Sequence, residues 1–107
     1  MAVEILIRRK FIAKKANEVA PLMVKLRSLA LTQTVYISGE SLRCIDPPGE
    51  NEYLVRSTWR SVEDWKNWSN SEVRTGIQKQ IDVITGEETE YKIYEPLVGG
   101  IASKYNE

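Results

Sequence analysis

The groups that could carry acid–base chemistry in this chain are carboxylates, phenols and lysine amines, because the sequence contains no histidine. Histidine is the side chain whose charge ordinarily changes near neutral pH, so its absence removes the commonest proton-transfer group. A reaction through a substrate anion then needs a glutamate, aspartate, tyrosine or lysine as base, and an arginine to stabilise the negative oxygen. Five residues of suitable type lie in strand-like segments and could face a cavity: Arg8, Tyr36, Glu40, Tyr53 and Arg56.

Glu40 is the most suggestive acid of this set. It follows Gly39, and a glycine inside a strand pattern indicates a β-bulge or a close backbone approach that could turn the carboxylate inward. A buried carboxylate with a raised pKa would be the signature of a base. Each of the five residues also has a simpler possible role on a sheet surface, in a salt bridge, in edge solvation or in packing.

Other kinds of site are excluded by composition. With Cys44 as the single cysteine and no histidine, no zinc-ligand spacing exists, and we predict no metal site. The single cysteine forms no disulfide within the chain, and we expect a reduced, cytoplasmic setting.

The 15 basic and 15 acidic residues give zero net charge, which argues against nucleic acid as a partner. The N-terminal apolar run is too short for a signal peptide, and no apolar stretch approaches a membrane span.

All three tryptophans lie between Ser57 and Glu72, in STWRSVEDWKNWSNSE. Trp59 ends a predicted strand, and Ser61 with its acidic followers is typical of a helix start. Trp65 and Trp68 follow, about one helical turn apart. Trp68 could press against a planar ligand, or it could be a core residue of an amphipathic helix.

Hydrophobic periodicity predicts the order β-α-β-β-α-β in one domain over residues 3–96, with 97–107 as a tail or arm. Asn17 is the expected N-cap of the first helix, and Pro21 should lie near its first turn. Val73, Ile77, Ile81 and Ile84 should form the buried stripe of the last helix.

We expect an α+β fold of ferredoxin type, an antiparallel sheet with helices on one face and the second helix split. The first and third strands should pair in parallel at its centre. The expected strands are 3–9, 35–46, 52–59 and 89–94, and the expected helices are 16–30, one from residue 61, and 71–84.

The helices would cover only one face of such a sheet. Neighbouring positions along the strands carry large apolar residues on both sides, as in Ile5 with Leu6 and Tyr53 with Leu54. A sheet with one wet face would alternate more cleanly. We therefore predict a two-fold homodimer through the helix-free face; a monomer with scattered apolar residues is the alternative.

Three pieces of sequence, YISGESL (36–42), DPP (46–48) and STWRSVEDWKNWSNSEVR (57–74), resemble in order and spacing the antibiotic biosynthesis monooxygenase family. The resemblance runs from Val3 to Pro96. It implies a dimeric ferredoxin-like α+β barrel with a ligand cavity between each subunit's sheet and helices. Some members of this family oxidise aromatic substrates without metal or cofactor, a related branch binds and degrades haem, and others have no known activity.

The resemblance to the haem-degrading branch is incomplete. That branch uses a strand asparagine, a helix tryptophan and a helix histidine. Trp68 matches the tryptophan, Gln78 stands where the histidine should be, and Arg8 stands near the asparagine by an ungapped count. An amide oxygen is a weak ligand for haem iron, so haem degradation is not expected and no cofactor is predicted.

Two functions follow from the resemblance and the residues. One is cofactor-independent oxygenation of a small aromatic or quinol compound; the alternative is a non-catalytic, dimeric small-ligand-binding or stress-associated module of the same fold. The candidates are Glu40 and Arg8 for catalysis, and Trp68, Tyr36, Tyr53, Arg56 and Gln78 for ligand binding.

Overall fold

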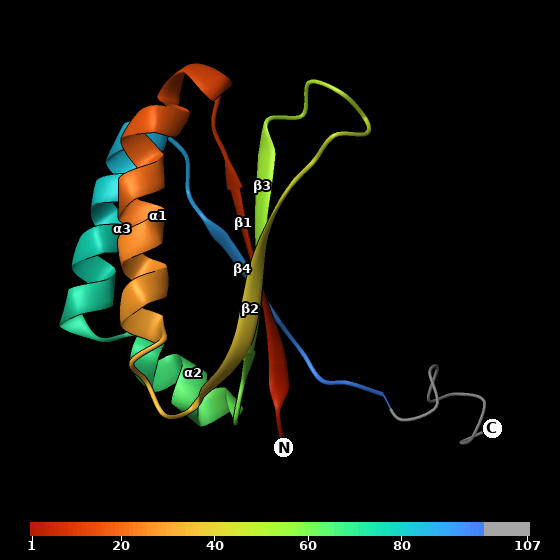
Figure 1. Ribbon diagram of the computed structural model, residues 1–107, viewed down its shortest axis with the longest axis vertical. Coiled ribbons are helices and arrows are strands. Elements are labelled where there is room, and N and C mark those ends of the chain that lie inside the picture. The colour runs from red at the N-terminus through yellow and green to blue at the C-terminus, as the bar shows by residue number, and fades with distance from the viewer. Residues whose placement is uncertain (98–107) are drawn as a thin grey trace.

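The computed structural model describes residues 1–97 as a sheet with one layer of helices (Figure 1). Residues 98–107 lie outside this range, so the predicted tail or arm is described only at Leu97. The helices α1 and α3 run side by side over one face of the sheet, and α2 closes one end. The elements are β1 (Val3–Lys10), the 3-10 turn η1 (Ala13–Lys15), α1 (Ala16–Ala30), β2 (Tyr36–Arg43), β3 (Glu52–Trp59), α2 (Val62–Ser69), α3 (Glu72–Thr85) and β4 (Glu90–Tyr94).

The predicted element order and the split second helix are confirmed. The strand order is β2-β3-β1-β4, with the first and third strands at the centre as expected. Their predicted parallel pairing is wrong, because β1 runs antiparallel to both β3 and β4. The strands that each helical crossover joins do run parallel, but one strand separates them in the sheet. No helix among residues 1–97 is both long and apolar enough to cross a membrane.

The strand β1 divides the sheet into an inner face beneath the helices and an outer, helix-free face. Its burial alternates strictly, with Val3, Ile5, Ile7 and Arg9 buried and the residues between them half-exposed. Ile5 and Ile7 pair across from Ser57 and Val55 of β3, so these side chains also point inward. The inner face of β1 therefore carries the core and, at its end, one arginine.

The bounds of α1 are as predicted, but its N-cap differs. The helix follows directly from η1, and its N-cap is Lys15, whose side chain makes no capping hydrogen bond. The preceding turn already holds this end through the Lys15 N–H bond to the Ile12 carbonyl, at 2.9 Å. The expected cap at Asn17 is therefore wrong, and Pro21, expected near the first turn, lies inside the helix.

The ends of α2 and α3 follow the sequence signals. The hydroxyl of Ser61 accepts from the Asp64 N–H at 3.1 Å, the hydroxyl of Ser71 caps α3, and Gly86 ends α3 at a φ of 73°. The buried stripe of α3 is rotated relative to the prediction. Val73 is 56% exposed, whereas Arg74 is buried. The stripe consists of Arg74, Ile77, Gln78 and Ile81, which share one helix face at steps of three and four residues.

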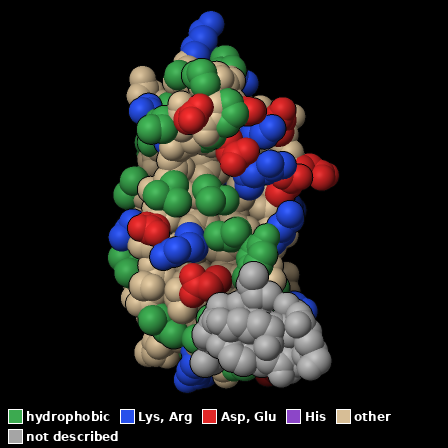
Figure 2. Space-filling view, turned by 90° about the vertical axis from the view of Figure 1, so that its right-hand side faces the viewer, with side chains coloured by type: hydrophobic (Ala, Val, Ile, Leu, Met, Phe, Trp, Pro, Cys, Tyr) green, Lys and Arg blue, Asp and Glu red, His purple; other side chains and the backbone are tan. Residues whose placement is uncertain are grey.

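The outer face of the sheet is mixed in character rather than continuously apolar, as Figure 2 shows. Arg56 forms ion pairs there with Glu40 at 3.2 Å and with Glu4 at 3.7 Å. Leu42 is 46% exposed, and Leu54 is half-exposed. The expectation of two apolar faces is thus wrong for this face, because charged residues alternate with the leucines. The homodimer through it stays a prediction.

Candidate functional site

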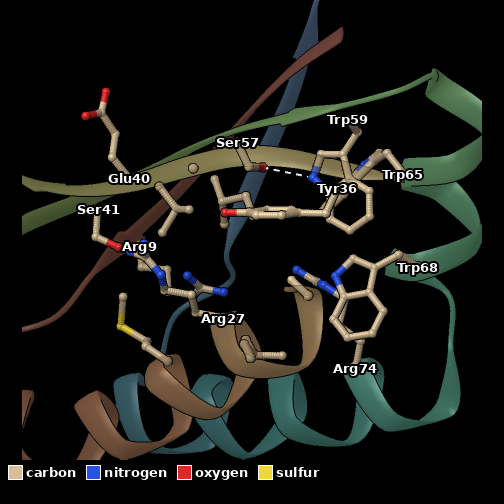
Figure 3. A pocket seen from close by; sticks show the side chains of 16 residues that line it. Arg9, Arg27, Tyr36, Glu40, Ser41, Ser57, Trp59, Trp65, Trp68 and Arg74 are labelled. Atoms are coloured by element: carbon tan, nitrogen blue, oxygen red, sulfur yellow. Dashed lines mark hydrogen bonds between the residues drawn. The ribbon is translucent and has the colours of Figure 1, made fainter. Parts of the chain in front are cut away.

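A cavity of about 70 Å³ lies between the inner face of the sheet and the helices. Figure 3 shows its walls, with the strands on one side and α1 and α3 on the other. Its aromatic lining consists of Tyr36, Trp59, Trp65 and Trp68. A site for a drug-sized ligand typically measures about 300–1,000 Å³, so this space suits at most a single small ring.

The tryptophans form a rigid wall centred on Trp59, which is 1% exposed. Its ring meets that of Trp65 edge to face at 5.6 Å, and it stacks on Trp68 at 6.2 Å between centroids. Its indole N–H donates to the Ser57 hydroxyl at 3.1 Å. Because the polar atom of Trp59 is satisfied inside the wall, the ring presents an apolar surface to the cavity.

Tyr36 extends the aromatic lining beside Trp59, whose ring it meets edge to face at 5.2 Å between centroids, and it lies directly over Gly39. A Cβ atom at Gly39 would lie 2.2 Å from the Tyr36 hydroxyl oxygen and 3.3 Å from the Arg56 carbonyl. The close approach predicted at Gly39 is therefore confirmed. The register irregularity of β2 lies earlier, between Tyr36 and Ser38.

Because of this irregularity, Tyr36 does not share a face with Ser38 and Glu40, as strict alternation along β2 would require. Tyr36 faces the helices, whereas Ser38 and Glu40 pair across from the outward residues Thr58 and Arg56. The side chain of Glu40 points away from the cavity in Figure 3, although its backbone lies at the edge. The expectation that the kink aims Glu40 inward is wrong, because one extra residue shifts the alternation.

Arg8 and Arg56 also lie on the outer face, and their expected position in a cavity is wrong. Arg8 is an even-numbered residue of β1, and the strict alternation of that strand turns it outward. Its Nε donates to Glu90 at 2.6 Å, and its Nη1 donates to Glu52 at 3.3 Å. The hydrogen bond to Glu90 raises the pKa of Arg8.

Tyr53 and Gln78 lie on the inner side but outside the cavity lining. Tyr53 stacks on Phe11, with 4.0 Å between ring centroids, and lines a more open neighbouring groove of about 320 Å³. Gln78 is buried beside Arg9 and is not placed to ligate a group in the cavity. Of the seven predicted site residues, Trp68 and Tyr36 thus contribute side chains to the lining.

The residue that sequence reasoning missed is Arg9, which is 4% exposed and lines the cavity. Its Nη2 donates to the Gln78 side-chain oxygen at 2.7 Å, and its Nε has no hydrogen-bond partner among the described residues. The pKa of Arg9 is lowered to about 10, mainly by burial, and the nearby charge of Arg74 acts in the same direction. The sequence pattern that predicts this burial is the alternation of β1, in which Arg9 follows Val3, Ile5 and Ile7 on the same face of the strand.

Arg74 is the second missed residue, equally buried at 4% exposure. Its guanidinium lies over the rings of Trp65 and Tyr91, at 5.2 and 5.1 Å from their centroids. Its Nη2 donates to the Tyr91 hydroxyl at 3.0 Å. The helical spacing of Arg74 with Ile77 and Ile81 was the signal that could have identified it.

No carboxylate among residues 1–97 lies within ion-pair distance of Arg9 or Arg74, since neither takes part in a salt bridge there. Asp82 reaches Arg9 only through an amide, because the Gln78 nitrogen donates to Asp82 at 2.8 Å and to Thr89 at 2.7 Å. The described residues include no cluster of three or more side chains suited to a metal ion. The cavity is therefore apolar in its walls and cationic at one side.

The fold is that of antibiotic biosynthesis monooxygenase-type structures. SnoaB, a cofactor-independent oxygenase from Streptomyces nogalater, aligns at a TM-score of 0.73 with 11% identity, over 90% of this chain and 93% of that one. A putative antibiotic biosynthesis monooxygenase from Nitrosomonas europaea aligns at 0.77 with 8% identity, over 92% of each chain. A conserved protein from Methanosarcina mazei aligns at 0.80 with 15% identity, over 91% of this chain and 94% of that one.

At these identities the likeness shows the fold alone. No family model matches the chain, and no curated protein matches it.

We expect the Arg9→Met substitution to raise the free energy of unfolding of the ligand-free protein by roughly 1–3 kcal/mol. Burial lowers the pKa of Arg9, so the folded state pays a cost for the charge that is full at neutral pH and is relieved only as pH rises through about 10. Urea denaturation measures the change. A loss of stability would instead show that the guanidinium supports the fold.

We expect the Gly39→Ala substitution to cost about 1–3 kcal/mol, because the new methyl group displaces the Tyr36 ring from its contact with Trp59. Gly76→Ala is the matched control: nothing lies within 4 Å of a Cβ there, and alanine favours a helix, so stability should rise by up to about 1 kcal/mol. Denaturation followed by tryptophan fluorescence reports both. Equal effects of the two changes would contradict the close contact.

Proposed function

We propose that this protein binds a small, single-ring aromatic compound in the cavity and oxygenates it with O2, without metal or cofactor. The observation that carries the proposal is the aromatic-walled cavity of about 70 Å³ between sheet and helices. The shared fold of SnoaB, a cofactor-independent oxygenase, supports it.

The cavity walls give a ring two kinds of contact. Trp68 and Tyr36 supply aromatic surfaces, and such contacts contribute about 0.5–1.5 kcal/mol beyond area burial. The aliphatic side chains of Ile7 and Leu26 complete the lining and exclude water. Exclusion of water strengthens the attraction between a positive charge at the wall, such as that of Arg9, and an anionic substrate.

The substrate binds as a phenolate or enolate that has already lost its proton to bulk water, because the described lining offers no inward-pointing carboxylate as a base. The resulting anion donates electrons to O2, and a ring C–H opposite the oxygen becomes a carbonyl. One oxygen atom enters the product, the other leaves as water, and the carbon is oxidised while O2 is reduced. The protein binds the ring, stabilises the anion and provides the Tyr36 hydroxyl as a proton-transferring group at the cavity.

Binding without catalysis is the second candidate function. It is favoured by the absence of an inward-pointing carboxylate in the described lining, where Glu40 is turned away and pairs with Arg56. Under this alternative the protein recognises a small aromatic compound and releases it unchanged.

Oxygen uptake with single-ring phenols that carry a hydrogen opposite the hydroxyl, and with a tricyclic anthrone for comparison, tests the catalytic proposal. We expect uptake with the small compounds, a loss of at least about tenfold in kcat/KM for Trp68→Ala, and retention of activity by Trp68→Phe, which keeps an aromatic face. Incorporation of one labelled atom from 18O2 distinguishes oxygenation from simple oxidation to peroxide. Binding of these compounds without uptake would favour the non-catalytic alternative.

We propose, in addition, that two copies pair through the outer face of the sheet, where Leu42 and Leu54 lie between charged residues. Leu42→Asp should weaken this pairing because it introduces a buried charge at the interface. Val83→Asp, at an 82% exposed position of α3, is the control that should leave the oligomeric state unchanged. Sedimentation equilibrium measures the mass. A monomeric wild-type protein at high concentration would overturn this part of the proposal.

A further inference from the structure

We propose that the cavity is an anion site, and that its ligand is a small aromatic compound carrying a delocalised oxyanion, either a carboxylate or a ring oxygen, held by Arg9 and Arg74. This inference rests on the proposed function only in taking the ligand to be aromatic. It adds the residues that hold the negative charge of the ligand, and it extends the possible anions to a carboxylate.

The first argument is the unmatched charge of Arg9. A buried cation ordinarily has an anionic partner, because removing a charge from water is costly unless it is paired. Arg9 has the neutral Gln78 oxygen as its hydrogen-bond acceptor, and its Nε has no partner among residues 1–97. An oxyanion in the cavity would supply both the missing acceptor and the missing charge.

The second argument is that Arg74 does not neutralise this charge but adds to it. Its hydrogen bond goes to the neutral hydroxyl of Tyr91, and its cation lies over the rings of Trp65 and Tyr91. Stacking on aromatic faces holds a guanidinium in place without cancelling its charge. Two fixed cations thus border one water-poor space, where an anion is attracted much more strongly than in bulk water.

The mouth of the cavity carries a third arginine. Arg27 of α1 lines both the cavity and the adjoining groove, together with Met23 and Ser41, and its side chain projects between helices and sheet in Figure 3. No carboxylate of the described chain pairs with Arg27. Clefts lined by one sign of charge raise the local concentration of the opposite ion, so Arg27 would attract an anion to the entrance.

The surroundings favour a planar aromatic anion over an inorganic one such as phosphate. Most of the lining is apolar, including Ile7, Leu26 and the tryptophans, and would leave the oxygens of phosphate unsatisfied. Guanidinium groups instead present paired, coplanar N–H donors that match a carboxylate or a phenolate edge. The ring of such a ligand would lie against Trp68 and Tyr36.

The test compares ligands that differ in charge but not in shape. Benzoate and benzamide, titrated against the wild-type protein by calorimetry or tryptophan fluorescence, separate the charge from the ring. The second arm titrates 4-nitrophenol below and above its own pKa, which separates a ring oxyanion from a carboxylate. We expect at least one anion to bind about tenfold or more tightly than its neutral counterpart.

Variants then assign the preference to residues. Arg9→Met should remove most of the preference for the anion and leave the affinity for benzamide unchanged. Arg74→Gln is the second variant, should Arg9→Met fold poorly. Lys25→Met, which removes an exposed cation from α1, is the control for net charge and should change neither affinity.

The possible results separate the anion site from the proposed oxygenation. Neutral compounds binding as tightly as their anions would overturn the anion site while leaving an aromatic site standing. An anion preference that survives both arginine substitutions would overturn the assignment to Arg9 and Arg74. Anion binding that depends on Arg9, without oxygen uptake, would support this inference and contradict the catalytic part of the proposed function.

Discussion

The pairing of β1 with a strand on each side is the constraint on which the site depends. A central strand with two antiparallel neighbours has a fixed register, and its side chains cannot change face without breaking both ladders. Ile5 and Ile7 must point to the core, so Arg9 must point there too, and Arg8 must point away. The cation at the cavity is therefore a consequence of how the hydrophobic core is placed.

Sequence reasoning succeeded where a local rule decides the structure. Alternation identified β1 as a strand, and the serines at 61 and 71 marked the starts of α2 and α3. It failed where one residue changes the phase, as in β2, whose irregularity after Tyr36 turned Glu40 outward. A bulge leaves little trace in composition, because it is set by how the strand meets its neighbour.

The arginines were missed for a different reason. A charged residue on a predicted buried face is normally read as a strand end or helix surface, since burial of a lone cation is unfavourable. Arg9 and Arg74 break that rule in the same place, which is what a functional site does. Glu40, the carboxylate that looked catalytic, by contrast pairs with Arg56 on the opposite face of the sheet.

The wall shared by the cavity and the groove has a consequence for ligand exchange. Met23 and Arg27, whose side chains are long and unbranched, line both spaces together with the small Ser41. Such side chains change rotamer within picoseconds to nanoseconds, far faster than helices or strands separate. A ligand that moves from the groove into the cavity would therefore need no backbone hinge. The largest ligand that could pass would depend on the side chains of Met23 and Arg27 in α1. A different choice at either position would retune that size without disturbing the scaffold.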